Sequence, residues 1–118
     1  MTNLPERIEQ LAVQVAAKTR EVQDLRDQIG QRESAAAIEI LNARDEEGRP
    51  LYSNETARGA ALKLALAANT RYTDLERRLA VAETERAQLL ANLERARNEF
   101  RLHLLDRQQE IAVMNSGQ

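Results

Sequence analysis

The sequence predicts an all-α protein: a long antiparallel coiled-coil helical hairpin with a short alanine-rich helix near its tip. Alanine occupies 19 of the 118 positions, and charged residues make up 31% of the chain against 3% for aromatic residues. Apolar residues recur at alternating spacings of four and three in two separate segments, which is the pattern of a coiled-coil seam. A turn around Gly48 and Pro50 separates the two segments. We therefore expect a single helical-hairpin domain over residues 1–118.

The first helix is expected over about residues 5–47. Thr2 or Asn3 can cap its N-terminus, and Pro5 suits its first turn. The register of the apolar residues changes after Ile29, and Gly30 at that point is interpreted as a stutter or slight bend. Lys18 and Arg32 occupy two of the expected seam positions. The seam residues are Ile8, Leu11, Val15, Val22, Leu25 and Ile29, continued in the changed register by Ala37, Ile38, Ile40 and Leu41.

The turn is expected over residues 48–53. Gly48 can adopt the left-handed conformation that ends a helix, and a helix does not continue through a proline. Leu51 and Tyr52 are apolar for a loop, so we expect them to pack under the turn against the alanine-rich helix. The acidic run at residues 45–47 lacks the ligand spacing of a calcium loop and is interpreted as a solvated helix end. The hairpin-tip motif consists of Gly48, Pro50, Leu51, Tyr52, Ser53 and Asn54, with Ser53 or Asn54 as the cap of the next helix.

Two further helices are expected, at about residues 54–68 and 70–114. Helix-forming residues lapse over residues 69–73, where we expect a kink or short break, and Thr73 with Glu76 fits a capping box. Arg86 falls on the seam of the last helix, from which we expect it to reach an acid on a facing helix or to specify the register. The seam residues of this helix are Tyr72, Leu75, Leu79, Ala82, Leu89, Leu93, Ala96 and Phe100.

The composition argues against several kinds of chemistry. The chain has no cysteine and one histidine, so neither a thiolate nucleophile nor a multi-histidine zinc site is expected. Its four glycines are scattered, and none belongs to a phosphate-binding loop. His103 and Glu99 lie one helical turn apart and are interpreted as a surface contact and not as a proton-transfer pair. We therefore predict no catalytic residue, no metal ligand and no cofactor, and a protein that is not an enzyme.

The sequence also lacks the marks of a secreted or membrane protein. It shows no basic segment followed by an apolar run at its start, and no stretch of 18 consecutive apolar residues. We expect a cytoplasmic protein that does not enter a membrane.

Several apolar residues of the last helix lie off its seam and have no partner inside a two-helix hairpin. They predict a homo-oligomer, most simply a dimer that forms a four-helix bundle. The candidate oligomer contacts are Leu90, Leu104, Leu105 and Ile111.

Charge is distributed unevenly although the net charge is −2. Residues 1–47 hold six basic and ten acidic groups, residues 48–69 hold three and one, and residues 70–118 hold eight of each. An arginine-bearing face could follow a phosphate backbone. The alternative, which we favour, is a solvated face and pairing with the acidic first helix. The candidate nucleic-acid contacts are Arg71, Arg77, Arg78, Arg97 and Arg101.

The turn and a later patch carry a resemblance to a known group. The chain reads G-x-P-L-Y-S-N-E from Gly48 to Glu55, and Arg97, Asn98 and Phe100 form an R-N-x-F patch. In this it resembles small uncharacterised helical-hairpin proteins of bacteria and their phages or prophages. The group has no established function, so the resemblance implies only the hairpin fold. Its genes are associated with phage recombination or single-strand annealing, which favours nucleic-acid binding slightly.

Two functions follow as hypotheses. The first is a non-enzymatic coiled-coil interaction or scaffold protein that acts through its helical surfaces and binds its own copies and an unidentified protein. The second is a phage-type accessory protein of DNA recombination or annealing that binds nucleic acid through arginines of the last helix.

Overall fold

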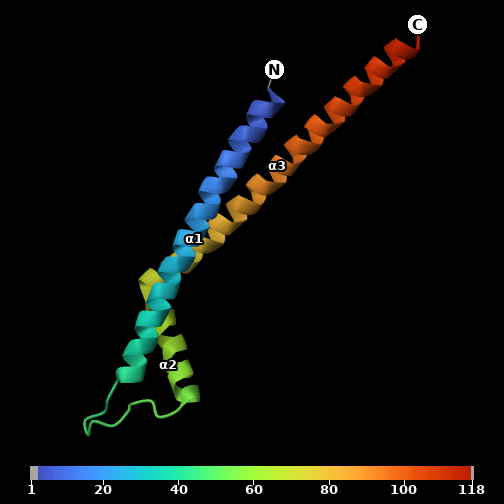
Figure 1. The fold of residues 1–118 in the computed structure, drawn as a ribbon. Coiled ribbons are helices and arrows are strands. Elements are labelled where there is room, and N and C mark those ends of the chain that lie inside the picture. The colour runs from blue at the N-terminus through green and yellow to red at the C-terminus, as the bar shows by residue number, and fades with distance from the viewer. Residues whose placement is uncertain (1–2, 118) are drawn as a thin grey trace. The chain divides into compact units, whose positions relative to one another are not determined.

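The computed structural model describes residues 3–117, and these form an all-α helical hairpin (Figure 1). Helix α1 spans Leu4–Asn42, α2 spans Glu55–Ala68 and α3 spans Thr70–Ser116. The long helix α1 leads into a loop and the short α2, and α3 then runs antiparallel to α1. The predicted fold class and the predicted short helix after the turn are therefore confirmed.

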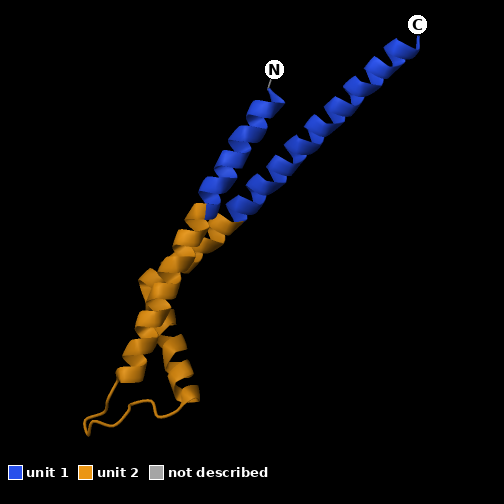
Figure 2. Cartoon of the chain, in the orientation of Figure 1, with its two compact units in different colours: residues 1–19, 84–118 blue, residues 20–83 orange. Residues whose placement is uncertain are grey.

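The chain divides into two compact units, and each contains part of both long helices (Figure 2). The first unit comprises residues 1–19 and 84–118, and the second comprises residues 20–83. The loop, α2 and the break between α2 and α3 all belong to the second unit.

Helix α1 begins at a side-chain cap and ends earlier than predicted. Asn3 Oδ1 accepts a hydrogen bond from the backbone N–H of Glu6 at 3.4 Å, while Thr2 lies outside the described residues. The helix passes through Gly30 without interruption. It ends at Asn42, so the predicted extension to residue 47 is wrong. The acidic run beyond it lies in the loop, where it avoids the unfavourable negative end of the helix dipole.

The loop is a small ordered hairpin that starts at Ala43. Leu51 N–H donates to the carbonyl of Ala43, and Asp45 N–H donates to the carbonyl of Arg49, both at 2.9 Å. Asp45 Oδ1 in turn accepts from the N–H groups of Glu47 and Arg49, each at 2.9 Å. Gly48 has φ +79°, as expected for the left-handed residue of the turn. Asp45 is thus the organising residue of the loop, because an aspartate can bond to the backbone of its own turn.

Asparagines cap both helices that follow. Asn54 Oδ1 accepts from the N–H of Ala57 at 2.8 Å, which selects Asn54 over Ser53 as the cap of α2. Asn69 leaves the helical conformation, and its Oδ1 accepts from the N–H of Tyr72 at 3.0 Å. The predicted break is confirmed, but the predicted capping box at Thr73 is wrong, because Thr73 Oγ1 donates to the carbonyl of Thr70 inside α3. Helix α3 also continues to Ser116, past the predicted end at residue 114.

The predicted seams carry the core of both units. In the second unit, Val22, Leu25, Leu75 and Ala82 form a buried cluster against which Ile29 and Leu79 pack. In the first unit, Leu93 and Ala96 are buried. Other predicted seam residues of this unit are half-buried: Ile8, Leu11, Val15, Leu89 and Phe100.

The register of the seam changes after Ala36 and not, as predicted, after Ile29. Ala37, Ile38 and Leu41 are exposed, with Ile38 at 58%. Arg32 and Ala36 are half-buried, so the spacing of three and four continues past Gly30 as far as Ala36. The next half-buried residue is Ile40, four positions further on, which is the member of the predicted set that the structure does place on the seam. The arginine at position 32 disguised this continuation, because a cation at a seam position interrupts the apolar pattern.

Candidate interaction surfaces

The long helices are linked by polar contacts at the edges of their seam. In the first unit, Lys18 Nζ lies 2.6 Å from Glu85 Oε2, and Arg86 Nε donates to Thr19 Oγ1 at 2.7 Å. Arg86 therefore reaches across to the facing helix, but its partner is a hydroxyl group and not the expected acid. In the second unit, Arg26 lies 2.9 Å from Glu83. These partly exposed pairs favour one register of the two helices more than they add stability.

Tyr72 and Glu33 form a partly buried polar contact between α1 and α3 in the second unit. The Tyr72 hydroxyl donates to Glu33 Oε2 at 3.1 Å, and Tyr72 is 8% exposed. Burial raises the pKa of the Tyr72 phenol, and the bond to Glu33 and the charges of Glu33 and Glu76 raise this pKa further. The neutral phenol is therefore the form that the fold favours. The apolar pattern of the sequence predicts Tyr72 on the seam but does not indicate Glu33 as its partner.

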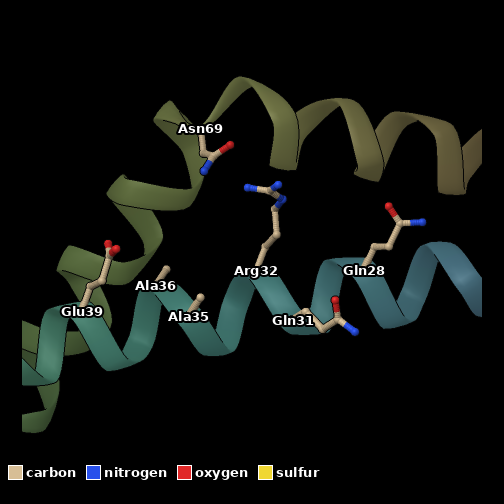
Figure 3. Close-up of a pocket in the computed structure, with 7 residues that line it drawn as sticks. All are labelled: Gln28, Gln31, Arg32, Ala35, Ala36, Glu39 and Asn69. Carbon is tan, nitrogen blue, oxygen red and sulfur yellow. The ribbon is translucent and has the colours of Figure 1, made fainter.

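A polar groove lies where α1 passes the junction of α2 and α3 (Figure 3). Its volume is about 400 Å³. Arg32 extends from α1 toward Asn69. Gln28 and Glu39 also belong to α1; Gln28 lines the end of the groove that faces α3, and Glu39 lines the end that faces α2. A half-buried guanidinium beside an amide can bind an anionic oxygen. The groove is open and carries one acidic residue on its rim, so its charge is balanced.

In the hairpin tip, hydrogen bonds hold the backbone, and the side chains other than that of Tyr52 are exposed. Tyr52 is half-buried and lines a hollow on α2 together with Ala57, Ala61 and Leu64, as expected. Leu51 is 52% exposed, so the expectation that it packs under the turn is wrong. Leu51 contributes to the turn through its backbone N–H, which bonds to the carbonyl of Ala43, and not through its side chain.

The candidate nucleic-acid contacts are all exposed and all lie on α3, in two different units. Arg71, Arg77 and Arg78 belong to the second unit, and Arg97 and Arg101 lie one turn apart in the first. Arg77 is partly engaged, because its guanidinium lies 3.7 Å from Asp74.

The candidate oligomer contacts are exposed, as are several neighbours along α3. Leu90 is 38% exposed, Leu104 45%, Leu105 53% and Ile111 52%. Leu102, Val113 and Met114 are exposed to a greater degree. These side chains form the largest group of exposed apolar residues on one helix of the described chain.

The remaining chemistry of the described residues is sparse. His103 and Glu99 are both exposed on α3. Over residues 3–117 no group of three or more histidine, cysteine, aspartate or glutamate side chains is arranged to hold a metal ion. None of the three helices, as far as the structure describes them, combines the length and apolar character of a membrane crossing.

Comparison with known proteins adds no relative. No protein-family model matches the chain, and no curated protein or solved structure shows a significant match to it.

Proposed function

We propose that the protein is a non-enzymatic interaction protein that acts through its helical surfaces and associates with its own copies. The observation that carries this proposal is the exposure of Leu90, Leu104, Leu105 and Ile111 on α3, where α1 does not cover them. Large exposed apolar side chains gathered on one helix mark a contact surface, because their burial removes apolar area from water.

The polar features support the same function. The groove beside Arg32 and the hollow beside Tyr52 are open, and no polar side-chain atom of the described residues is buried without a hydrogen-bond partner. An enzyme site usually gathers perturbed titratable groups in an enclosed pocket. Tyr72, whose pKa is clearly shifted, is engaged in a structural contact between helices through its hydrogen bond to Glu33.

Sedimentation equilibrium over a wide range of protein concentrations tests the proposal. We expect the apparent molar mass to rise with concentration toward a multiple of the chain mass. A chain that remains a monomer at every concentration would contradict self-association and leave the exposed leucines without a role.

The second candidate function is nucleic-acid binding by α3. It is favoured by exposed arginines for which the described structure provides no ion-pair partner, at Arg71, Arg78, Arg97 and Arg101. Phosphate contacts of this kind weaken steeply as the salt concentration rises.

A mobility-shift titration with single-stranded and duplex DNA at two salt concentrations tests this candidate. We expect the double variant Arg97→Glu and Arg101→Glu to lose binding. The matched control is Arg49→Glu with Lys63→Glu, which changes the net charge equally at exposed positions outside α3. Equal loss in both variants, or no binding by the wild type, would rule out a specific role for α3.

A further inference from the structure

Helix α3 extends beyond the start of α1 within the first unit. Thr19 lies opposite Arg86, and each step back along α1 corresponds to one step forward along the antiparallel α3. Leu4, the first residue of α1, therefore lies opposite about Arg101. The burial agrees with this register, because Leu4 and Phe100 are half-buried and every described residue after Phe100 is exposed. We call residues 102–116 of α3 the overhang.

The face that α3 turns toward α1 continues into the overhang. Leu104 and Ile111 follow Leu93 and Phe100 by eleven residues, which is close to three turns of a straight helix, so each pair projects within about 20° of the same direction. Met114 lies one turn beyond Ile111. These overhang residues are 45%, 52% and 70% exposed, whereas Leu93 is 5% exposed. Leu104 and Ile111, which the heptad pattern placed off the seam, therefore continue its face past the point where α1 stops covering it.

The helical state of the overhang also calls for a partner. Fifteen residues of helix without tertiary packing are marginal in water, since most helical stability in proteins comes from burial of an apolar face. Because the uncovered residues continue the face that packs against α1, another helix fits as that partner, in the place that α1 takes further back along α3.

We propose that the overhang of a second copy of this chain is that partner, paired tail to tail and antiparallel about a two-fold axis near Gln109. This inference rests on the proposed self-association and names its surface. In this register Leu104 of one copy lies opposite Met114 of the other, and the contact ends where α1 of each copy begins. Each seam is then covered along its whole length, by α1 over one part and by the second copy over the rest.

The charges of the overhang fit the same pairing. Arg107 lies on the continuing seam, as Lys18 and Arg86 do within the hairpin, and both of those cations reach across to the facing helix. The two-fold pairing sets Arg107 beside Glu110 of the second copy, and the axis repeats this pair. A parallel pairing would instead place Arg107 beside Arg107. The overhang carries one arginine against one aspartate and one glutamate besides His103, so two copies do not accumulate a large like charge.

The absence of cysteine from the natural chain allows a direct test of orientation. Leu104→Cys and Met114→Cys variants of the full chain are equilibrated in a glutathione redox buffer, separately and mixed. We expect the mixture to form disulfide-linked heterodimer in several-fold higher yield than either variant forms homodimer. Preferential homodimer formation would overturn the antiparallel register, and the absence of any cross-link would overturn the overhang as the contact.

A second measurement separates this inference from self-association in general. Ile111→Glu is expected to return the chain from dimer to monomer in sedimentation equilibrium with unchanged helix content, whereas Leu64→Glu, at a 73% exposed position on α2, is expected to remain a dimer. A dimer that survives Ile111→Glu but dissociates in Leu90→Glu would show side-by-side association and overturn the tail-to-tail contact alone. A wild-type chain that is monomeric at every concentration would overturn both proposals.

Discussion

The Tyr72 hydroxyl donates a hydrogen bond to Glu33 Oε2 at 3.1 Å, joining the first turn of α3 to α1 across 39 positions of the sequence. The phenol is buried beside the break between α2 and α3, where Asn69 caps the same turn through the Tyr72 N–H. One residue therefore links the cap of α3, the hydrophobic seam and the facing helix.

Tyr72→Phe removes this bond and leaves Glu33 without the phenol. We expect a loss of about 0.5–1.5 kcal/mol in the free energy of unfolding, the usual range for one hydrogen bond, measured by denaturant titration at neutral pH and one protein concentration. Tyr52→Phe, at a half-buried residue whose hydroxyl has no hydrogen bond in the described structure, is the matched control. A loss as large in the control would assign the effect to aromatic packing.

The same bond predicts a dependence of stability on alkaline pH. The folded-state pKa of Tyr72 is raised above its unfolded value of about 10. The folded state therefore holds this proton more tightly than the unfolded state. The stabilisation is complete below about pH 10 and is lost as the pH rises through the folded-state pKa. The Tyr72→Phe variant should lose less stability than the wild type over this range.

Spectroscopy isolates this titration, because the chain has two tyrosines. In the Tyr52→Phe variant, ultraviolet absorbance reports the ionisation of Tyr72 alone. We expect its midpoint to lie above that of the denatured chain. A midpoint at or below the denatured value would contradict the buried hydrogen bond.

Much of the fold followed from the sequence because the seam obeys a helical period. The predicted seam residues from Ile8 to Ile29 and from Tyr72 to Phe100 are buried or half-buried throughout. The prediction of the seam from helix propensity and apolar pattern failed where a polar side chain occupies a seam position. Arg32 is half-buried at such a position, and the exposed apolar residues Ile38 and Leu41 further along α1 mimicked an earlier shift of register.

The errors at helix ends have a different cause. Asp45 bonds to the N–H groups of Glu47 and Arg49 and so draws these residues into the loop. Hydrogen bonds from a side chain to nearby backbone compete with helix formation. Whether a given aspartate ends a helix in this way depends on the geometry of the turn that it closes. The candidate surfaces were predictable as exposed residues of α3, whereas the Arg32 groove and the overhang depend on which residues of α1 and α3 face each other.

The seam of the second unit should tolerate truncation poorly. Leu25 is 2% exposed and belongs to the buried cluster with Val22, Leu75 and Ala82. We expect Leu25→Ala to cost about 2–5 kcal/mol, the range for a buried leucine, in the free energy of unfolding from denaturant titration. Leu64→Ala, at a 73% exposed position, should change it by less than about 0.5 kcal/mol. Similar losses in the two variants would contradict the assignment of the core.

Helix α3 is capped by Asn69 and not by Thr73, which the sequence predicted as the cap. Asn69→Ala removes the acceptor for the Tyr72 N–H and is expected to cost about 1 kcal/mol, as is typical for a helix cap. Thr73→Ala removes a hydroxyl that bonds to the carbonyl of Thr70 inside the helix, and should cost less. The check is thermal and denaturant unfolding followed by circular dichroism. The opposite order of the two losses would restore Thr73 as the cap.

The glycines at the turn and in the helices should respond to alanine with opposite signs. Gly48 has φ +79°, which costs an alanine about 1–2 kcal/mol, although open space surrounds the position where a Cβ would lie. Gly59 lies inside α2 with a negative φ and equally open space, so Gly59→Ala is expected to stabilise the fold by about 0.5–1 kcal/mol through helix propensity. Both variants add one methyl group without a steric contact, so the backbone conformation alone separates them. Denaturant titration of the pair checks this, and a stabilising Gly48→Ala would mean that the loop does not hold its left-handed turn.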